Sequence, residues 1–275
     1  MKNNQILINQ ILEQVKKHKK YSSISNTIVK KEILSYLIIN PKTTLADKQT
    51  IKEIRAKLHR VYSSYQTRKK GKRNIYLEEL KKDPENIDIT NQLLSITLST
   101  KERLNSYQEI YKKIFKITGK PKTIIDIGAG LNPLSFPYMK LKQLTYFAYD
   151  IDLEDIKFLN KYFKIMKIKG KAKIMDVREL NNLKKLPSSD ITFMFKLIDL
   201  IDSKSKRKNK ISEELITYLL KNKTKFIVAS FATHTLTRKS MNLPRRRGFE
   251  LMLERNQLSF KIIKTSNEVF YIIYI

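Results

Sequence analysis

The feature that most constrains the fold is the alternation of short apolar runs with helical stretches from residue 120 onward. The short apolar runs are 123–127, which is rich in β-branched residues, and 145–149, 171–175, 191–195 and 225–230. Parallel strands need long crossovers such as the helical stretch 153–168, and the helices then cover both faces of the sheet. Two final runs, 259–264 and 269–275, are separated by four residues and predict a hairpin. The sequence thus predicts an α/β fold with a mostly parallel sheet and an antiparallel C-terminal hairpin.

The preceding part of the chain instead has apolar residues at helical spacing. We expect Asn26 to cap one helix, and Asp47 to lie at the start of another that extends to residue 66. Ser99 and Glu102 have the spacing of a capping box, and Gly119 is placed to end the helix that follows them. This part of the chain is therefore predicted to be helical.

The total length suits one large domain or two modest ones, and 41% apolar residues among 275 suffice for a folded core. We expect a helical region over residues 1–119 and an α/β domain over residues 120–275. No run approaches the ~20 apolar residues of a membrane span, and the N-terminus lacks signal-peptide features. We therefore expect a cytoplasmic protein with no membrane contact. The chain has no cysteine and three widely separated histidines, so disulfides are excluded and no metal site is predicted.

Charge indicates the kind of partner. Lysine and arginine total 56 against 26 acidic residues, a formal net charge of +30, which favours a polyanion and above all nucleic acid. A lysine-rich composition of the kind that an AT-rich genome produces explains scattered lysines, but it explains dense basic clusters less well. The residues that we expect to contact RNA are Arg68, Lys69, Lys70, Lys72, Arg73, Arg238, Lys239, Arg245, Arg246 and Arg247.

A glycine turn follows the first predicted strand. Gly128 and Gly130 allow the backbone to turn sharply and to approach a ligand closely, and Pro133 suits the first turn of the next helix. Asp150 ends the next strand, where a carboxylate can accept hydrogen bonds from both ribose hydroxyls of a nucleoside. The combination predicts a nucleoside cofactor, although a turn of this kind can also be purely structural.

The identity of the cofactor depends on the residues around this turn. A dinucleotide fingerprint requires a third glycine, and Pro133 occupies that position. Asp126 suits the cationic methionine end of S-adenosylmethionine, and Asp176, after the third strand, is placed to accept from the adenine amino group. We therefore expect S-adenosylmethionine. A nicotinamide-dependent oxidoreductase is the competing interpretation, and the chain offers no evident proton donor for it.

The stretch from Asp126 to Leu134, D-I-G-A-G-L-N-P-L, resembles the first motif of the aminoglycoside-resistance (Arm type) small-subunit rRNA guanine-N7 methyltransferases, close to D-x-G-C-G-x-N-P-L. The resemblance extends over nearly the whole chain, with thin similarity between its anchors. Further similar stretches are Lys57–His59, Ser99–Leu104, Ala148–Asp152, Phe195–Leu197, Ser230–Phe231 and Asn267–Val269.

The resemblance implies a helical RNA-docking region followed by a Rossmann-like class I methyltransferase domain. It implies methyl transfer from S-adenosylmethionine to guanine N7 in the decoding region of 16S rRNA. Arg103 would bind the cofactor carboxylate, and Lys196 would lie near the transferred methyl group. Phe231 would stack on the target base or else pack in the core. The residues expected to contact the cofactor are Arg103, Asp126, Gly128, Ala129, Gly130, Asn132, Asp150, Ile151, Asp176 and Phe195.

The chain also departs from the family pattern. Ala129 replaces a cysteine, and Ala232 replaces the proline that the family has after Phe231. The segment 231–239 lacks the family's glycine, so the target nucleotide stays open, as does the choice between a resistance enzyme and a housekeeping one. Alternatives are a methyltransferase acting on another RNA such as tRNA and a catalytically idle ribosome-assembly factor. The expected partner is the small ribosomal subunit, and we expect a monomer.

Overall fold

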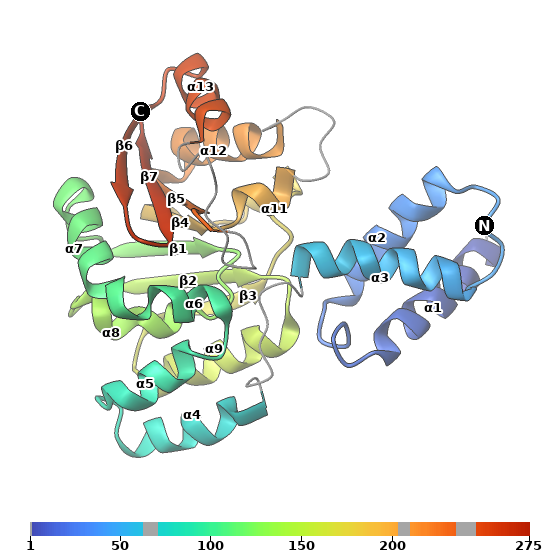
Figure 1. Ribbon diagram of the computed structural model, residues 1–275, viewed down its shortest axis with the longest axis horizontal. Helices are drawn as coiled ribbons and strands as arrows, with labels where there is room; N and C mark the ends of the chain where they lie inside the picture. The colour runs from blue at the N-terminus through green and yellow to red at the C-terminus, as the bar shows by residue number, and fades with distance from the viewer. Residues whose placement is uncertain (1, 63–70, 203–209, 235–245) are drawn as a thin grey trace.

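The computed structural model describes residues 2–62, 71–202, 210–234 and 246–275. The chain forms a three-helix bundle beside a larger α/β body (Figure 1). The bundle consists of α1 (Lys2–Lys17), α2 (Asn26–Ile39) and α3 (Lys48–Tyr62). None of the described helices is long and apolar enough to cross a membrane.

The α/β body is built on one seven-stranded sheet with the order β3-β2-β1-β4-β5-β7-β6. The strands from β3 to β5 are parallel, and β7 and β6 are antiparallel, so the predicted fold class is confirmed. Chain order reverses between β1 and β4, and ligands of such sheets bind beyond the strand ends at that point. The strands are β1 (Thr123–Ile127), β2 (Thr145–Asp150), β3 (Lys169–Ile174), β4 (Ser189–Phe195), β5 (Thr224–Ala232), β6 (Ser259–Lys264) and β7 (Glu268–Tyr274).

Helices cover both faces of the sheet and bury a separate apolar cluster on each. One face carries α4 (Arg73–Lys82), α5 (Ile87–Leu94), α7 (Tyr107–Thr118), α8 (Phe136–Met139) and α9 (Leu153–Ile165). The other face carries α10 (Leu180–Leu183), α11 (Ile198–Asp202), α12 (Lys210–Asn222) and α13 (Arg247–Arg255). The β-branched and aromatic residues of the predicted strands thus lie between two helical layers, as expected for a parallel sheet.

The hydrophobic cores place the boundary between bundle and α/β body between α3 and α4, and not at residue 119 as predicted. The bundle has its own core, which includes Ile11, Val15, Ile33 and Ile54. Helices α4, α5 and α7 instead share one core with the sheet. Residues 1–119 are helical where the structure describes them, but about half of that region packs as part of the α/β body.

The predicted helix ends are partly correct. Asp47 Oδ1 accepts a hydrogen bond from the Thr50 amide at 2.7 Å, and Gly119 ends α7 with φ 75°. The cap at Asn26 is wrong, since Ser25 holds that position without a side-chain bond.

The capping box at Ser99 is also wrong. The N-cap of α6 (Leu98–Arg103) is Thr97, and the carboxylate of Glu102 reaches Lys196 instead of its own helix start. The single helix predicted to end at Gly119 is divided into α6, the 3₁₀ turn η3 (Leu104–Ser106) and α7. The interruption directly follows Glu102 and Arg103, whose side chains are both committed to partners in the α/β body.

Candidate cofactor site

A cavity opens at the C-terminal ends of β1, β2 and β4, where chain order reverses. Its empty volume, including the open mouth, is about 1070 Å³, at the upper end of the range typical of small-molecule sites. The residues predicted to bind the cofactor that do line it are Arg103, Gly128, Ala129, Gly130, Asn132, Asp150, Ile151 and Phe195. Lys196 lines it as well, whereas Asp126, Asp176 and Phe231 do not.

The glycine turn forms the floor of the cavity. Gly128 has φ 65° and Gly130 has φ 48°, both in the left-handed region that glycine adopts without strain. A Cβ on Gly128 would lie 2.8 Å from Leu197 Cδ1, so any other residue there would also displace the leucine side chain. The amides of Gly128 and Ala129 both donate to the Tyr149 carbonyl, at 2.9 and 3.1 Å, which ties the turn to β2.

Asp150 fixes the other side of the turn. Its Oδ2 accepts from the Gly130 amide at 2.8 Å, and its Oδ1 accepts from the amides of Ile151 and Asp152 at 2.6 and 3.2 Å. Burial raises the pKa of Asp150, and these three backbone hydrogen bonds oppose the rise. The carboxylate is therefore held rigidly in the cavity wall, and it retains acceptor capacity for a ligand hydroxyl.

Asp126 lies beneath the turn and is 1% exposed. Its Oδ2 accepts from the Tyr146 hydroxyl at 2.7 Å and from Asn132 Nδ2 at 2.9 Å. Its Oδ1 has no hydrogen-bond partner among the described residues. Burial raises the pKa of Asp126 to about 6 against these hydrogen bonds. A buried carboxylate with an unused oxygen beside a cavity suits a cationic ligand group.

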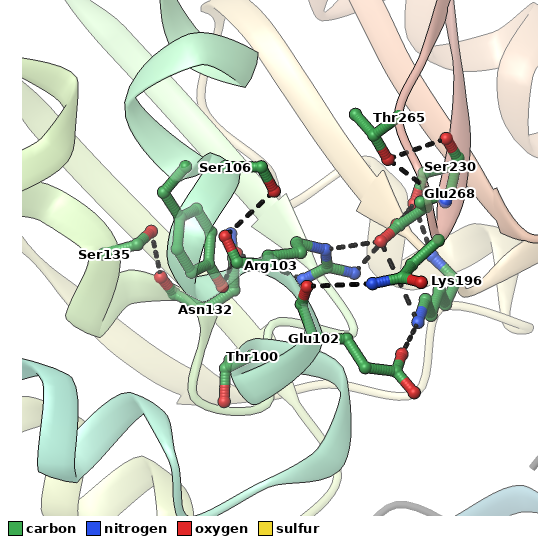
Figure 2. A network of polar contacts seen from close by, with 12 residues as sticks. Thr100, Glu102, Arg103, Ser106, Asn132, Ser135, Lys196, Ser230, Thr265 and Glu268 are labelled. Atoms are coloured by element: carbon green, nitrogen blue, oxygen red, sulfur yellow. Dashed lines mark hydrogen bonds and ion pairs between the residues drawn. The ribbon is translucent and has the colours of Figure 1, made fainter. Parts of the chain in front are cut away.

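Arg103 reaches the cavity from the end of α6 (Figure 2). Its Nε and Nη2 donate to the two carboxylate oxygens of Glu268 at 2.8 and 2.9 Å, and Nη1 donates to Asn132 Oδ1 at 3.4 Å. The guanidinium also lies over the Phe195 ring, 4.9 Å from its centroid. Burial lowers the pKa of Arg103, but the charge and hydrogen bonds of Glu268 more than offset this effect, and the arginine stays charged.

Lys196 completes this buried network. It has φ 54°, unusual for a residue with a side chain, and its Nζ lies 2.5 Å from Glu102 Oε2 and 3.8 Å from Glu268 Oε2. The sequence predicted only a helix-capping role for Glu102 and no role for Glu268. Both glutamates lie in stretches that are similar to the family, Ser99–Leu104 and Asn267–Val269. That similarity could have identified them as site residues.

Two predicted site residues have other roles. The Asp176 carboxylate accepts two hydrogen bonds from the Arg178 guanidinium, at 2.9 and 2.7 Å, and Lys31 lies 3.4 Å away. It thus faces away from the cavity, and Met175, Val177 and Arg178 form that part of the wall.

Phe231 is 2% exposed and makes edge-to-face contacts with Phe249 and Tyr271. The structure therefore supports the core interpretation of Phe231 and not base stacking.

The structure gives different surroundings to the residues that were predicted to contact RNA. Arg73 is buried and pairs with Asp155 at 2.6 Å and with Glu154 at 3.1 Å, so its prediction as a phosphate contact is wrong. Arg246 lies over the Phe231 ring and pairs with Asp199 at 3.1 Å. Lys72 is exposed, and so is the Arg247 side chain. Outside the described residues lie Arg68, Lys69, Lys70, Arg238, Lys239 and Arg245.

Comparison with known proteins identifies the family. The family model described as "Ribosomal RNA methyltransferase (FmrO)" matches residues 18–275. The chain belongs to the FmrO family of ribosomal RNA methyltransferases. It is 26% identical to a 16S rRNA (guanine(1405)-N(7))-methyltransferase of Proteus mirabilis, over 99% of both chains. An enzyme of the same name from Frankia casuarinae is 22% identical, over 97% of this chain and 93% of that one.

Solved structures show the same fold. The 16S rRNA methyltransferase RmtF, in complex with S-adenosyl-L-homocysteine, superposes with a TM-score of 0.79 at 20% identity, over 98% of both chains. The 16S rRNA methylase RmtB gives a TM-score of 0.72 at 20% identity, over 97% of this chain and 98% of that one. The predictions of the family, of the class I methyltransferase fold and of S-adenosylmethionine as methyl donor are thereby confirmed.

Proposed function

We propose that this FmrO-family methyltransferase acts on N7 of the guanine in the decoding region of 16S rRNA that corresponds to position 1405, the position named for its relatives. The observation that carries the proposal is the cavity, in which the glycine turn, Asp150, Arg103 and Lys196 meet at one edge of the sheet. These residues lie at the C-terminal ends of the strands where strand order reverses, and nucleoside ligands bind at that position in this fold.

The residues of the cavity fit S-adenosylmethionine. The charge of Asp126, beneath the glycine turn and outside the cavity lining, attracts the methionine ammonium. A guanidinium has five N–H donors, so the Glu268 pair leaves Arg103 with donors for the methionine carboxylate. Asp150 accepts from the ribose hydroxyls, and the left-handed turn at Gly128 lets the backbone approach the ligand. Asp176 contributes indirectly, because it fixes the Arg178 guanidinium in the wall.

Bound S-adenosylmethionine supplies a methyl group on a sulfonium. Guanine N7 carries a free lone pair, so the protein needs no general base, and positive charge passes from sulfur to the base without a change in total charge. Catalysis then depends on holding N7 in line with the methyl group, and orientation of this kind contributes on the order of 7–11 kcal/mol. The ammonium of Lys196, at the cavity, is a donor suited to O6, the acceptor beside N7 on guanine.

The target base must leave its helix to reach a buried methyl group, at a cost of a few kcal/mol. Basic residues near the cavity offset that cost by binding the flanking phosphates. Lys72 and Arg247 are exposed and are candidates for this task, although Arg247 also pairs with Glu254 at 3.2 Å; the basic segments outside the described residues are further candidates. A cytoplasmic location and a monomeric state stay predictions.

The test is transfer of label from radioactive S-adenosylmethionine to purified 30S subunits, 50S subunits and tRNA in parallel. We expect label in 30S subunits alone, with borohydride–aniline cleavage of the 16S rRNA at the guanine equivalent to 1405. Label in tRNA, or cleavage at another guanine, would contradict the substrate proposal. Binding of S-adenosylmethionine without transfer to any RNA would favour an idle assembly factor.

A further inference from the structure

The bundle α1–α3 holds the segment that follows Asp150. The loop between α1 and α2 lies antiparallel to this segment, with Ile24 opposite Asp152. The Ser25 amide donates to the Ile151 carbonyl at 3.2 Å, and the Ser23 hydroxyl donates to Asp152 Oδ2 at 2.7 Å. The Ile151 side chain packs against the apolar core of the bundle and also lines the cavity. One residue is therefore shared by the bundle and the cofactor site.

A second contact joins α2 to the segment that follows β3. Arg178 lines the cavity, and its Nη1 donates to Glu32 Oε1 at 3.0 Å while Nη2 donates to Asp176 Oδ2 at 2.7 Å. Lys31 lies 2.9 Å from Glu179 and 3.4 Å from Asp176. Glu32 is 4% exposed, so this ion pair is shielded from solvent. Buried ion pairs of this kind depend strongly on their geometry, because a displaced partner leaves an uncompensated charge.

Glu32 is an acidic residue in a bundle that is otherwise strongly basic. Residues 1–62 contain thirteen lysines and arginines but four acidic residues, so their surface favours polyanions. Glu32 is one of those four, and it is turned inward to the cavity wall. The segments held by the bundle follow β2 and β3, at the C-terminal ends of the strands, where sheets of this kind bind nucleoside ligands.

We propose that the bundle supports one wall of the cofactor site from behind, and that Arg178 and Ile151 couple rRNA docking on the bundle to cofactor binding. The proposal rests on the proposed function, because it takes the cavity as the S-adenosylmethionine site and rRNA as the polyanion. An RNA that shifts the bundle moves Glu32, which holds Arg178 in the wall. Coupling of this kind is reciprocal, so the cofactor raises affinity for the subunit by the same factor that the subunit raises affinity for the cofactor.

The experiment measures the dissociation constant of S-adenosylhomocysteine by calorimetry for the full-length chain, with and without saturating 30S subunits. For the wild type we expect the 30S subunit to tighten binding about fivefold or more. Glu32→Gln should weaken binding to the free protein about three- to tenfold and bring the coupling factor close to one. This is less than the loss of a whole charge-assisted hydrogen bond, because the glutamine amide oxygen can still accept from Arg178. Arg178→Lys keeps the charge but not the planar fork, and should behave in the same way.

Glu213→Gln is the matched control. Glu213 also pairs with an arginine, Arg255, at 2.7 Å, and neither residue lines the cavity. This variant should keep the wild-type affinity and coupling factor. Calorimetric melting of each variant without ligand separates loss of fold from loss of coupling. If Glu32→Gln does not fold, the affinity and coupling factor of Arg178→Lys test the proposal instead.

The results have distinct meanings. A wild type that binds S-adenosylhomocysteine but shows a coupling factor of one would overturn the inference, even if it methylates 30S subunits. The same conclusion holds if both variants keep wild-type affinity and coupling. A wild type that binds no S-adenosylhomocysteine, or methylates no rRNA, would instead overturn the proposed function.

Discussion

Replacement of Asp126 by asparagine tests whether the protein buries a charge in order to hold its cofactor. Burial raises the pKa of Asp126 from 3.8 to about 6, so ionisation above that pH opposes folding. The difference corresponds to ~3 kcal/mol, taken as an upper limit. Asparagine keeps an acceptor for Tyr146 and Asn132 and carries no charge. In the absence of cofactor, the variant should therefore be more stable than the wild type at pH 8, by about 1–3 kcal/mol.

The sign of the pH dependence follows from the same shift. A carboxyl whose pKa is raised by folding binds its proton more tightly in the folded chain, so its favourable contribution is present below pH 3.8 and is lost as the pH rises through about 6. The stability gain of Asp126→Asn should therefore shrink toward pH 4. Urea unfolding of the cofactor-free protein at several pH values measures this dependence directly.

Cofactor binding should change in the opposite direction. Loss of the anion beneath the turn should weaken S-adenosylhomocysteine binding about tenfold, since the attraction between two unit charges a few ångströms apart is roughly 1–4 kcal/mol. Wild-type affinity should rise with pH through about 6, and that of the variant should not. The reasoning is refuted if Asp126→Asn is less stable than the wild type at pH 8 or binds the cofactor equally well.

Asp190 provides the control for Asp126→Asn. Partial burial opposes ionisation of Asp190, but Lys225 and the amides of Lys122 and Thr123 outweigh that effect and lower its pKa. It stands in β4 at the opposite end from the cavity. Its contribution is present above its unfolded pKa and is lost as the pH falls through the lowered value. Asp190→Asn should thus cost less than ~1 kcal/mol, given its exposure, and leave cofactor affinity unchanged.

Three further substitutions separate the roles of the site residues. Asp150→Ala should weaken S-adenosylhomocysteine binding and leave RNA affinity unchanged, as calorimetry and filter binding would show; parallel loss of both would contradict the assignment. Gly128→Ala should destabilise the fold by ~1–2 kcal/mol through its left-handed backbone and the 2.8 Å approach of Leu197, and should abolish cofactor binding. Arg73→Ala should cost ~3–5 kcal/mol in urea unfolding, because it breaks the buried ion pair with Asp155, and should not alter the salt dependence of rRNA binding; a smaller salt slope would restore Arg73 as a phosphate contact.

The strands and the turn were predictable because their signals are local. β-branched runs such as 123–127 form strands wherever they are buried, and Gly128 and Asp150 occur at the ends of such runs. The partners of charged side chains were not predictable. Arg73 follows a basic run in the sequence, but its partner Asp155 is 82 residues away.

The same limit applies to the carboxylates of the site. Asp176 stands at a strand end, as Asp150 does, yet Arg178 and Lys31 draw it out of the cavity. Lys31 lies in the bundle, which contacts the segments that follow β2 and β3, and no local sequence pattern predicts that contact. Glu268 acquires its role only when β7 joins β5 and brings it to Arg103. Long-range pairing of this kind depends on the completed tertiary structure.

The left-handed backbone of Lys196 has an evolutionary consequence. An L-residue held in this conformation costs roughly 1–2 kcal/mol, which glycine would avoid. Glycine would also remove the ion pairs of Lys196 with Glu102 and Glu268, so a screen that rewards heat resistance alone should enrich glycine only together with a neutral residue at Glu102, whereas a screen that rewards modified ribosomes should retain lysine. Sequencing the survivors of both screens would then show whether methylation requires the Lys196 ammonium despite the backbone strain at this residue.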